Sequence, residues 1–574
     1  MRIVQFFFTL LLSSFTCFGQ FDTSQLMNTN TTPTYEEMVG FYVKYASEDN
    51  KIALFNMGLS DYGLPIFLCV LNAAQDSTTT FDKARESTTL LVNNGIHPGE
   101  PCGINASMQL VKDFSQMPAE AKTNFPLVAI ITSYNIGGMK NRSAYSRANQ
   151  NGPEEHGFRG NAQNLDLNRD FIKMDSKNMW TFATLFHALD PDVFIDTHTT
   201  NGADYQYTMT YIVPLFDRMP KSTQTLLFSN LIPHLEENMP KKWQYNIVPY
   251  VSINGKTLDK GINAFNPLPR YAMGYADLFN TLSFTTEAHM LKPFEDRVKS
   301  TYAFIFEILR WMNVSHEEIE QAREQAFDEQ KTRTEVPVDF EFNGKKDSIL
   351  FKGYEWEYKK SNLTAQNRLF YDRNKSFKRY IPHHFRYSPK QKVKVPSYYI
   401  VERQATEIIK RLEINKVDFQ VLTDDTLIKA ENFRIVEFHS PEKPYEGHFL
   451  HTGVHIEQTT DEVRFKKGDI LVPTNQRHQN FVVSVLDPRM EDSYFAWNFM
   501  DSYVQQKEYF SPYVFEDIAE KLLAEVPDLE KTYREKQKEK SFSENRWAQL
   551  YFLYKNSPYY EPSHNVLPIY GVND

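Results

Sequence analysis

Residues 88–111 read TTLLVNNGIHPGEPCGINASMQLV, and this stretch predicts a buried strand that turns directly into a helix. It opens with a short apolar run that ends at asparagine and glycine, as buried strands with an adjacent turn do. Apolar residues then recur at helical spacing from Ile104 onward. His97 and Glu100 therefore lie on a strand-to-helix turn, which is where ligand sites of α/β sheets gather.

Strand-like and helix-like segments of this kind alternate over residues 35–325. Such alternation predicts an α/β sandwich with a largely parallel or mixed sheet. Short alternating runs dominate residues 335–500, and the Lys- and Glu-rich residues 515–554 have helical spacing again. We therefore expect an α/β domain over residues 20–325 and a β-rich accessory region with terminal helices over residues 335–574.

The composition bounds the class of protein. The chain has 574 residues, more than one hydrophobic core usually serves, and 41% hydrophobic with 24% charged residues is typical of globular proteins. The net charge of −10 argues against a general nucleic-acid binder and a polybasic membrane binder. Three cysteines are too few for a disulfide scaffold. Export would permit a bond between Cys69 and Cys102, although nothing in the sequence requires it.

The N-terminus has the pattern of a secretory signal peptide. Arg2 precedes an apolar run that is too short for a membrane anchor, and small residues near Cys17 follow it. We expect a signal peptide over residues 1–19, cleavage near Gly19–Gln20, and a periplasmic or secreted protein without an integral membrane segment. Attachment of a lipid to Cys17 is the alternative, although the residue before it fits such a site poorly.

A histidine and a carboxylate three residues apart, such as His97 and Glu100, can bind one zinc ion. Pairs that begin at His234 and His439 share this spacing, so the glycine-rich strand end is what favours the first pair. His198 ends a second apolar run, DVFIDTH, and is a third candidate ligand. Its neighbour Asp196 could accept a hydrogen bond from the imidazole. Taken by itself, His198 could equally be a structural histidine.

Residues 158–171, FRGNAQNLDLNRDF, carry polar side chains that suit a substrate anion. The guanidinium groups of Arg159 and Arg169 can pair with carboxylate oxygens bidentately, and Asn168 can add hydrogen bonds. A loop held by Asp–Arg pairs is the alternative. Glu287 ends another strand-like run, LSFTTE, where a carboxylate can act as general base toward a metal-bound water. An ion pair with an arginine of the sheet is its alternative role.

The order His-x-x-Glu, Arg, Asn-Arg, His and Glu resembles the zinc carboxypeptidase family, the carboxypeptidase A-like metallopeptidases, over roughly residues 35–320. The stretch GDILVPTNQ, residues 468–476, and residues 492–501 are similar to the tails of long exported bacterial members. The resemblance implies an α/β/α sandwich with one zinc ion per chain. It implies a metallocarboxypeptidase, whose partner is a peptide with a free C-terminal carboxylate rather than a nucleic acid.

Carried over residue by residue, the resemblance implies the zinc ligands His97, Glu100 and His198, and Glu287 as the catalytic carboxylate. The residues that it implies for binding the C-terminal end of the substrate are Asn168, Arg169, Tyr271 and Tyr275. Only one of the two tyrosines would have this role, and neither has the spacing of the pancreatic enzymes.

The arginine that stabilises the oxyanion is implied to be Arg159, which lies nine residues before Asn168. Arg147 and Arg142 are rivals for this role. A zinc-dependent deacylase or amidase of the same fold, acting on N-acyl amino acids or cell-wall peptides, is the alternative function, but it would usually lack the Asn-Arg pair. A catalytically inactive exported binding module is a third reading, and it would be expected to lose Glu287 or a zinc ligand.

Two further clusters of side chains could each be either a ligand site or an ordinary polar surface. His448, His451, His455 and Glu457 crowd a strand-like segment, where a second metal site is conceivable and an exposed polar strand face is favoured. Residues 377–394 mix basic and aromatic side chains, a pattern that can bind polyanions. In an acidic, exported protein we interpret this segment as a charged surface.

Overall fold

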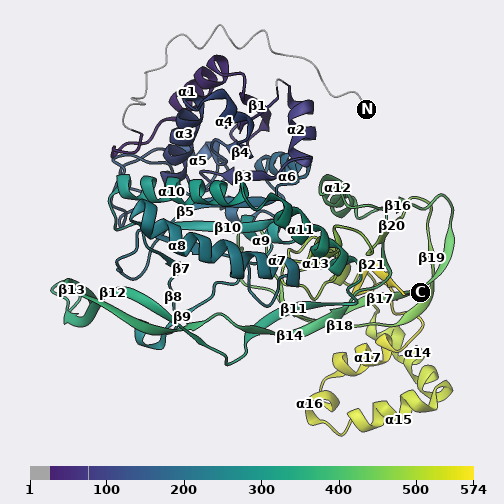
Figure 1. Cartoon of the computed structure of the whole chain (residues 1–574). Coiled ribbons are helices and arrows are strands. Elements are labelled where there is room, and N and C mark those ends of the chain that lie inside the picture. The colour runs from purple at the N-terminus through teal and green to yellow at the C-terminus, as the bar shows by residue number, and fades with distance from the viewer. Residues whose placement is uncertain (1–25, 75, 574) are drawn as a thin grey trace.

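The computed structural model describes residues 26–74 and 76–573, shown in Figure 1. The expected signal peptide over residues 1–19 lies outside the described residues. Among those described, no helix combines the length and the apolar character needed to cross a membrane. Cys69 and Cys102 are both buried and free, so the permitted disulfide is not formed.

A mixed eight-stranded sheet organises the first half of the chain, in the order β1-β2-β4-β3-β5-β10-β6-β7. Its strands are β1 (Ile52–Leu59), β2 (Pro65–Leu71), β3 (Thr89–Asn93), β4 (Leu127–Ile131), β5 (Val193–Thr200), β6 (Met209–Ile212), β7 (Ile247–Pro249) and β10 (Leu282–His289). The central strands β4, β3, β5 and β10 run parallel. β1 and β2 pair antiparallel with their neighbours, and β6 pairs antiparallel with β10 but parallel with β7. The central parallel strands are almost entirely buried, as expected of a sheet covered on both faces.

Helices cover both faces of this sheet. The helices of the two layers and their connections are α1 (Tyr35–Glu48), α2 (Ser77–Arg85), α3 (Cys102–Ser115), α4 (Ala119–Thr123), α5 (Ile136–Lys140), α6 (Lys177–Leu189), α7 (Lys221–Leu226), α8 (Ile232–Trp243), α9 (Ala272–Asp277), α10 (Phe294–Met312) and α11 (His316–Lys331). On β10, Phe284 contacts Phe304 of α10, while the next-door Ser283 bonds to the backbone of α9. Because adjacent strand residues point to opposite faces, α10 and α9 lie on opposite sides. The fold is the predicted α/β/α sandwich with a mixed sheet.

The rest of the chain is rich in strands, as predicted. The strands β12 (Asp347–Lys360) and β13 (Asn367–His384) form a long hairpin that runs along the molecule in Figure 1 and pairs with the short β9 and β8 from the first half of the chain. The strands from Tyr398 onward form a seven-stranded sheet. The strands are β8 (Ser252–Ile253), β9 (Ile262–Asn263), β11 (Glu335–Phe342), β12 (Asp347–Lys360), β13 (Asn367–His384), β14 (Tyr387–Lys394), β15 (Tyr398–Val401), β16 (Gln420–Val421), β17 (Thr426–His439), β18 (Thr452–Glu457), β19 (Thr460–Phe465), β20 (Ile470–Pro473) and β21 (Val566–Val572).

Helices close the C-terminal region. They are α12 (Thr406–Ile414), α13 (Gln479–Leu486), α14 (Pro512–Glu525), α15 (Pro527–Lys536), α16 (Lys540–Ser543) and α17 (Arg546–Lys555). The last four pack around an apolar cluster of their own and form the protruding yellow knob of Figure 1. In contrast, Phe481 of α13 packs on Phe279 and Tyr275 of the α/β domain within one continuous core. The C-terminal sheet therefore shares the core of the α/β domain through residues such as Tyr399 and Phe433, while Ile400, Ala430, Phe465 and Val572 form a smaller cluster of their own.

Candidate metal centre and active site

The candidate site lies at the carboxyl ends of three neighbouring parallel strands. His97 and Glu100 follow β3, His198 lies on β5, and Glu287 on β10 is paired in register with His198. Because β3 and β10 flank β5, residues far apart in sequence are brought together at one edge of the sheet. This is the position at which ligands bind in open α/β sheets.

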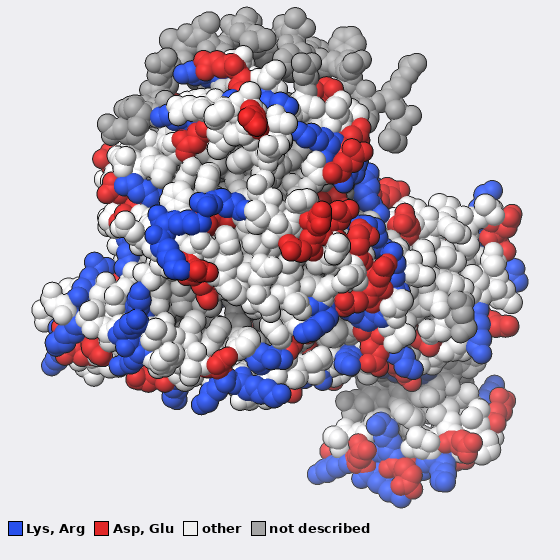
Figure 2. Space-filling view, in the orientation of Figure 1, with Lys and Arg blue, Asp and Glu red and all other residues white. Residues whose placement is uncertain are grey.

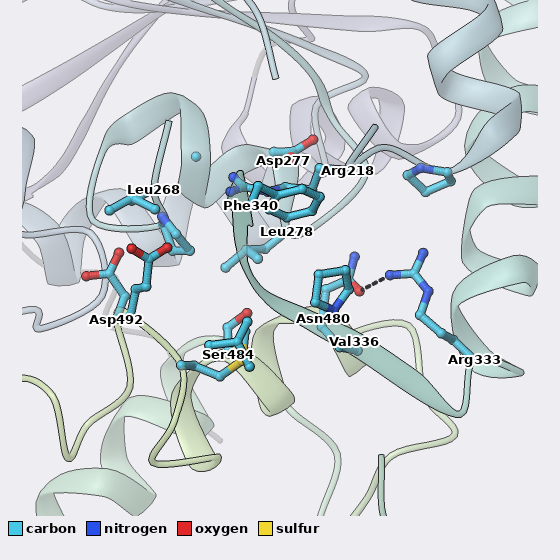
Figure 3. A pocket seen from close by; sticks show the side chains of 17 residues that line it. Arg218, Leu268, Asp277, Leu278, Arg333, Val336, Phe340, Asn480, Ser484 and Asp492 are labelled. Atoms are coloured by element: carbon cyan, nitrogen blue, oxygen red, sulfur yellow. Dashed lines mark hydrogen bonds between the residues drawn. The ribbon is translucent and has the colours of Figure 1, made fainter. Parts of the chain in front are cut away.

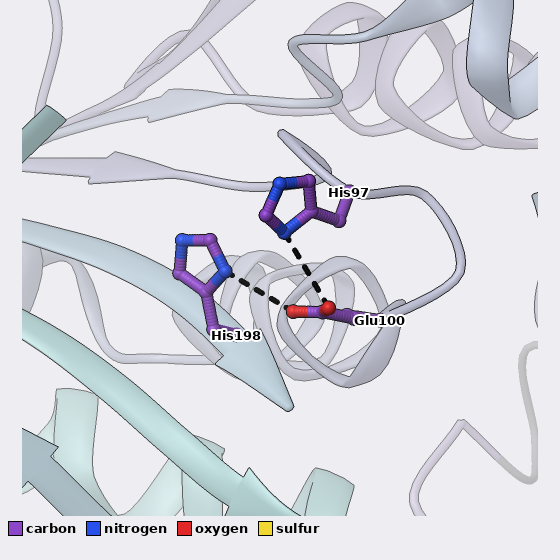
Figure 4. Close-up of side chains that lie close together, drawn as sticks. All are labelled: His97, Glu100 and His198. Carbon is purple, nitrogen blue, oxygen red and sulfur yellow. Dashed lines mark hydrogen bonds and ion pairs between the residues drawn. The ribbon is translucent and has the colours of Figure 1, made fainter. Parts of the chain in front are cut away.

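Figure 4 shows the three candidate metal ligands pointing toward one another. Nδ1 of His97 lies 3.4 Å from Oε1 of Glu100, and Nδ1 of His198 lies 3.1 Å from Oε2 of the same carboxylate. One ligand atom from each residue falls within 4.8 Å of the others, and all three residues are buried. Two imidazoles and one carboxylate form a donor set found in catalytic zinc sites, where a fourth position stays open. The donor set therefore fits zinc.

Both histidines are oriented by a carboxylate on the other ring nitrogen. Nε2 of His198 lies 2.7 Å from Oδ2 of Asp196, as the sequence predicted, and Nε2 of His97 lies 2.9 Å from Oδ1 of Asp166. Such partners fix the ring and strengthen it as a ligand. In both cases Nδ1 is left facing the common point at Glu100.

Glu287 has the electrostatics of an acid–base group. Burial raises its pKa to about 8, with further contributions from the nearby carboxylates of Glu100 and Asp196, and His198 acts in the opposite direction. A perturbed carboxyl in a cavity is typical of catalytic sites. Burial also opposes ionisation of Glu100, yet His97 and Arg147 outweigh it and hold the pKa of Glu100 well below its usual range.

Glu287 and the three candidate ligands line a single cavity of about 250 Å³. The other residues that line it are Arg147, Arg159, Asn168, Arg169, Thr199, Thr200, Asn201, Ile212, Tyr250, Phe265, Pro267, Tyr271, Met273 and Thr285. The lining combines three arginines with a group of apolar side chains. The cavity can therefore hold an anionic molecule that also carries an apolar part.

The structure distinguishes the three arginines that are candidates for stabilising the oxyanion. Arg147 lies 3.0 Å and Arg159 3.7 Å from Oε1 of Glu100, and both line the cavity. Arg159 also donates to Oδ2 of Asp166 at 2.8 and 3.0 Å. Arg142 instead donates to backbone carbonyl oxygens of residues that do not line the cavity. Arg142 is thereby removed from the candidates, and Arg147 stays beside Arg159.

The Asn-Arg pair lies beside the candidate metal ligands, with Nδ2 of Asn168 3.5 Å from Nε2 of His198. The amide oxygen of Asn168 accepts from the backbone of Ala272 at 3.0 Å. The guanidinium of Arg169 stacks 4.5 Å above the ring of Tyr271, and its Nε donates to the hydroxyl of Tyr445 at 2.9 Å. Both Asn168 and Arg169 line the cavity, so the predicted carboxylate-binding pair and the predicted metal ligands face the same space.

Of the two candidate substrate-binding tyrosines, only Tyr271 lines the cavity. Tyr275 is completely buried, donates its hydroxyl to Asn415 at 2.6 Å and packs against Phe182 and Phe186 of α6. The prediction of Tyr275 as a substrate contact is wrong, because Tyr271 precedes α9 with an extended backbone and lines the cavity, whereas Tyr275 lies within α9 and packs in the core.

Three residues at the site were missed by the sequence analysis. Asp166 lies within the quoted Asn-Arg segment, so its acidic side chain was visible but its distant partner His97 was not. Tyr250 comes from a short connection after β7 and has no motif around it. Tyr445 belongs to the C-terminal region, 276 positions from Arg169, and no local pattern indicates that contact.

The two other predicted clusters do not converge. Nε2 of His448 lies 2.9 Å from Asp175 and Nε2 of His451 lies 2.8 Å from Asp501, so each histidine has a separate partner. Within residues 26–74 and 76–573, the only group of three metal-binding side chains is the one at β3 and β5. Residues 377–394 lie on β13 and β14, and Figure 2 shows basic and acidic side chains interleaved along that part of the molecule.

No family model and no curated protein matches the chain. Solved structures do resemble it: the metallo-carboxypeptidase of Burkholderia cenocepacia has 15% identity and a TM-score of 0.35, over 49% of this chain and 69% of that one. The carboxypeptidase A of Helicoverpa armigera has 15% identity and a TM-score of 0.38, over 51% and 79%. Bovine thrombin-activatable fibrinolysis inhibitor has 12% identity and a TM-score of 0.37, over 51% and 99%. Each of these matches covers about half of this chain.

Proposed function

We propose that this protein is a zinc-dependent metallocarboxypeptidase that hydrolyses the C-terminal peptide bond of peptides. The observation that carries the proposal is that one cavity is lined by a His-Glu-His donor set, a partly buried carboxyl with a raised pKa and an arginine suited to a carboxylate. We also propose that the protein acts outside the cytoplasm, which rests on its N-terminal sequence alone.

His97, Glu100 and His198 would hold the zinc ion. When bound, such an ion acidifies a water molecule and polarises the carbonyl group of the scissile bond. Asp166 and Asp196 hold the two imidazole rings with Nδ1 toward Glu100, so that both Nδ1 atoms would be available to the ion. All three ligands are buried, and their rigid positions at strand ends support a preformed site.

Glu287 would transfer the protons. It takes a proton from the attacking water and later delivers it to the departing amine nitrogen. Its pKa of about 8 reflects burial beside other carboxylates. Glu287 would be charged, and so able to act as a base at neutral pH, when the neighbouring ligands hold a divalent cation.

Arg169 and Asn168 would bind the free C-terminal carboxylate, which makes the enzyme an exopeptidase. A guanidinium pairs with a carboxylate through two parallel hydrogen bonds. Arg159, with Arg147 beside it, is positioned near Glu100 to donate to the oxyanion that develops on the scissile carbonyl. Tyr271 also lines the cavity and stacks on Arg169.

The decisive experiment compares matched peptides that end in a free carboxylate or in an amide. The purified full chain is loaded with zinc, its metal content is measured, and products are identified by mass spectrometry. We expect one zinc per chain and release of the terminal residue from the acid peptide only. Equal cleavage of both peptides would contradict the exopeptidase reading and favour an amidase.

Two further outcomes separate the remaining alternatives. Release of acyl groups from N-acyl amino acids without peptide cleavage would identify a deacylase. Zinc binding without cleavage of either substrate class would identify a binding module. The variant His198→Ala serves as the matched negative control, because it should lose both zinc and activity.

A further inference from the structure

The loop between β17 and β18 reaches from the C-terminal region to the carboxylate-binding side of the cavity. The hydroxyl of Tyr445 accepts from Nε of Arg169 at 2.9 Å. The adjacent Glu446 accepts at 2.7 Å from the backbone N–H of Asp166, the residue that orients His97. Two neighbouring residues of this loop therefore contact both the Asn-Arg segment and the support of a metal ligand.

A second loop of the C-terminal region contacts the segment that carries Tyr271, the residue that stacks on Arg169. Asp492 accepts from the backbone N–H of Arg270 at 3.0 Å and pairs with its guanidinium at 2.9 Å, directly before Tyr271. Trp497 donates to Asp492 at 2.9 Å and stacks on Tyr445 with the rings 6.1 Å apart and 17° from parallel. Because Trp497 is completely buried, it joins the two loops into one rigid unit.

Figure 3 shows a second, smaller cavity, which Asp492 lines together with residues of α9 and of the C-terminal region. Arg218 in this cavity donates to the backbone of Pro267 and to Asn266, so it is used to hold the chain before Tyr271. This cavity belongs to the packing of the two regions. Its contacts fix the same loop that carries Tyr271.

The guanidinium of Arg169 is consequently held on three sides. Tyr271 stacks on its face, the hydroxyl of Tyr445 accepts from Nε, and the backbone carbonyl of Asn168 accepts from Nη1 at 2.8 Å. A guanidinium has five N–H donors, so donors remain for a carboxylate after these bonds are formed. A long side chain that is already fixed loses less entropy when it binds a ligand.

We propose that the C-terminal region is part of the substrate-binding site, with Tyr445 as a positioning residue that fixes the guanidinium of Arg169 for the substrate carboxylate. This inference rests on the proposed carboxypeptidase function and adds to it. Glu446 acts beside Tyr445 by fixing the backbone of Asp166. The region after residue 335 is then required for binding a free C-terminus and does not touch the reacting atoms.

The test removes only the hydroxyl. In the zinc-loaded full chain, Tyr445→Phe keeps the ring that stacks on Trp497 and should raise the KM for the acid peptide about three- to tenfold, with kcat nearly unchanged. Zinc content and the pH profile of kcat should stay as in the parent. Tyr533→Phe is the matched control, because its hydroxyl bonds to Gln549 in the terminal helices.

A double-mutant cycle shows whether Tyr445 acts through Arg169. In the background of Arg169→Met, the further change Tyr445→Phe should have no effect on KM. An equal effect in both backgrounds would overturn the proposal, and so would an unchanged KM in Tyr445→Phe. Glu446→Ala should also weaken binding, while Glu446→Gln, which keeps an acceptor oxygen, should restore it.

A binding measurement separates failure of this inference from failure of the proposed function. The affinity of the zinc-loaded protein for N-acetylphenylalanine, which carries a free carboxylate, is measured by titration calorimetry. Tyr445→Phe should weaken it about three- to tenfold even if the parent cleaves no peptide. Unchanged affinity would overturn the role of Tyr445, whereas absence of peptide cleavage alone would overturn only the activity.

Discussion

The α/β domain supplies the residues that line the cavity, whereas the C-terminal region contacts some of them from outside it. In the α/β domain, His198 and Glu287 are paired in register on neighbouring strands, so the sheet itself fixes their separation. In the C-terminal region, Tyr445 and Glu446 lie on a loop that is held by side-chain contacts with Trp497 and by the segment it touches. Under the proposed function, the sheet carries the groups that need exact geometry for bond cleavage, while the docked loop supports the groups that hold the substrate. Changes in the first set should act on turnover, and changes in the second on binding.

Glu287→Gln should give the largest effect, a fall in kcat, because Glu287 belongs to the residues fixed by the sheet. The amide keeps the shape of the side chain but cannot take a proton, so kcat should fall by about 10²–10⁴-fold or more. Zinc content and the KM for the acid peptide should change little, because neither the ligands nor Arg169 is altered. Single-turnover kinetics and metal analysis measure both. A variant with normal kcat would show that another group removes the proton.

Arg169→Met should act on the binding side. Loss of a charge-assisted pair costs roughly 1.5–3 kcal/mol, which corresponds to about 10- to 150-fold in kcat/KM. The loss should appear mainly in KM and only for peptides with a free C-terminus. Steady-state kinetics on the acid and amide peptides checks this. A loss of equal size for both peptides would mean that Arg169 does not bind the carboxylate.

The part of the site that the sequence could predict is the part made by local signals. The turn that carries His97 and Glu100, the strand end at His198 and the strand end at Glu287 each combine an apolar run with a polar residue after it. Parallel strands bring their carboxyl ends to one edge, so the convergence of these residues follows from the fold class. The predicted sandwich and the strand-rich second half are confirmed for the same reason.

The remaining contacts depend on packing between distant segments. The bond between His97 and Asp166 spans 69 positions, and that between Arg169 and Tyr445 spans 276. No periodicity encodes such pairs, because they arise only when two regions dock. Tyr275 was expected to contact the substrate from the family resemblance. Its place within α9 instead buries its side chain in the core.

Asp166→Asn tests a residue that is contacted by both regions, by His97 of the α/β domain and by Glu446 of the C-terminal region. An amide is a weaker acceptor for the ring of His97, and loss of such a partner typically lowers metal affinity by about 10- to 100-fold. Zinc affinity is measured by competition with a chromophoric chelator. Asp425→Asn, an exposed carboxylate paired with Lys466, is the control and should bind zinc as the parent does. Unchanged affinity in Asp166→Asn would show that the ring of His97 needs no such support.

The smallest expected effect concerns the pH dependence of the docked loop. Nε2 of His448 lies 2.9 Å from Asp175, whose other oxygen faces Arg411 at 3.8 Å and whose carboxylate also pairs with Lys173. Burial and Lys173 oppose protonation of His448, but the hydrogen bonds with Asp175 and Asn498 outweigh them and raise its pKa.

A histidine with a raised pKa in the folded state stabilises that state fully below its ordinary pKa of about 6.5, and the stabilisation is lost as the pH rises through the folded value. Relative to His448→Gln, the parent should therefore be more stable at pH 6, by on the order of 1 kcal/mol, and the difference should shrink toward pH 9. Melting temperatures of the two proteins between these pH values measure it. Two parallel curves would show that the loop is held without this charge, which would leave the stacking on Trp497 and the contacts of Tyr445 and Glu446 as the interactions that hold this loop beside the cavity.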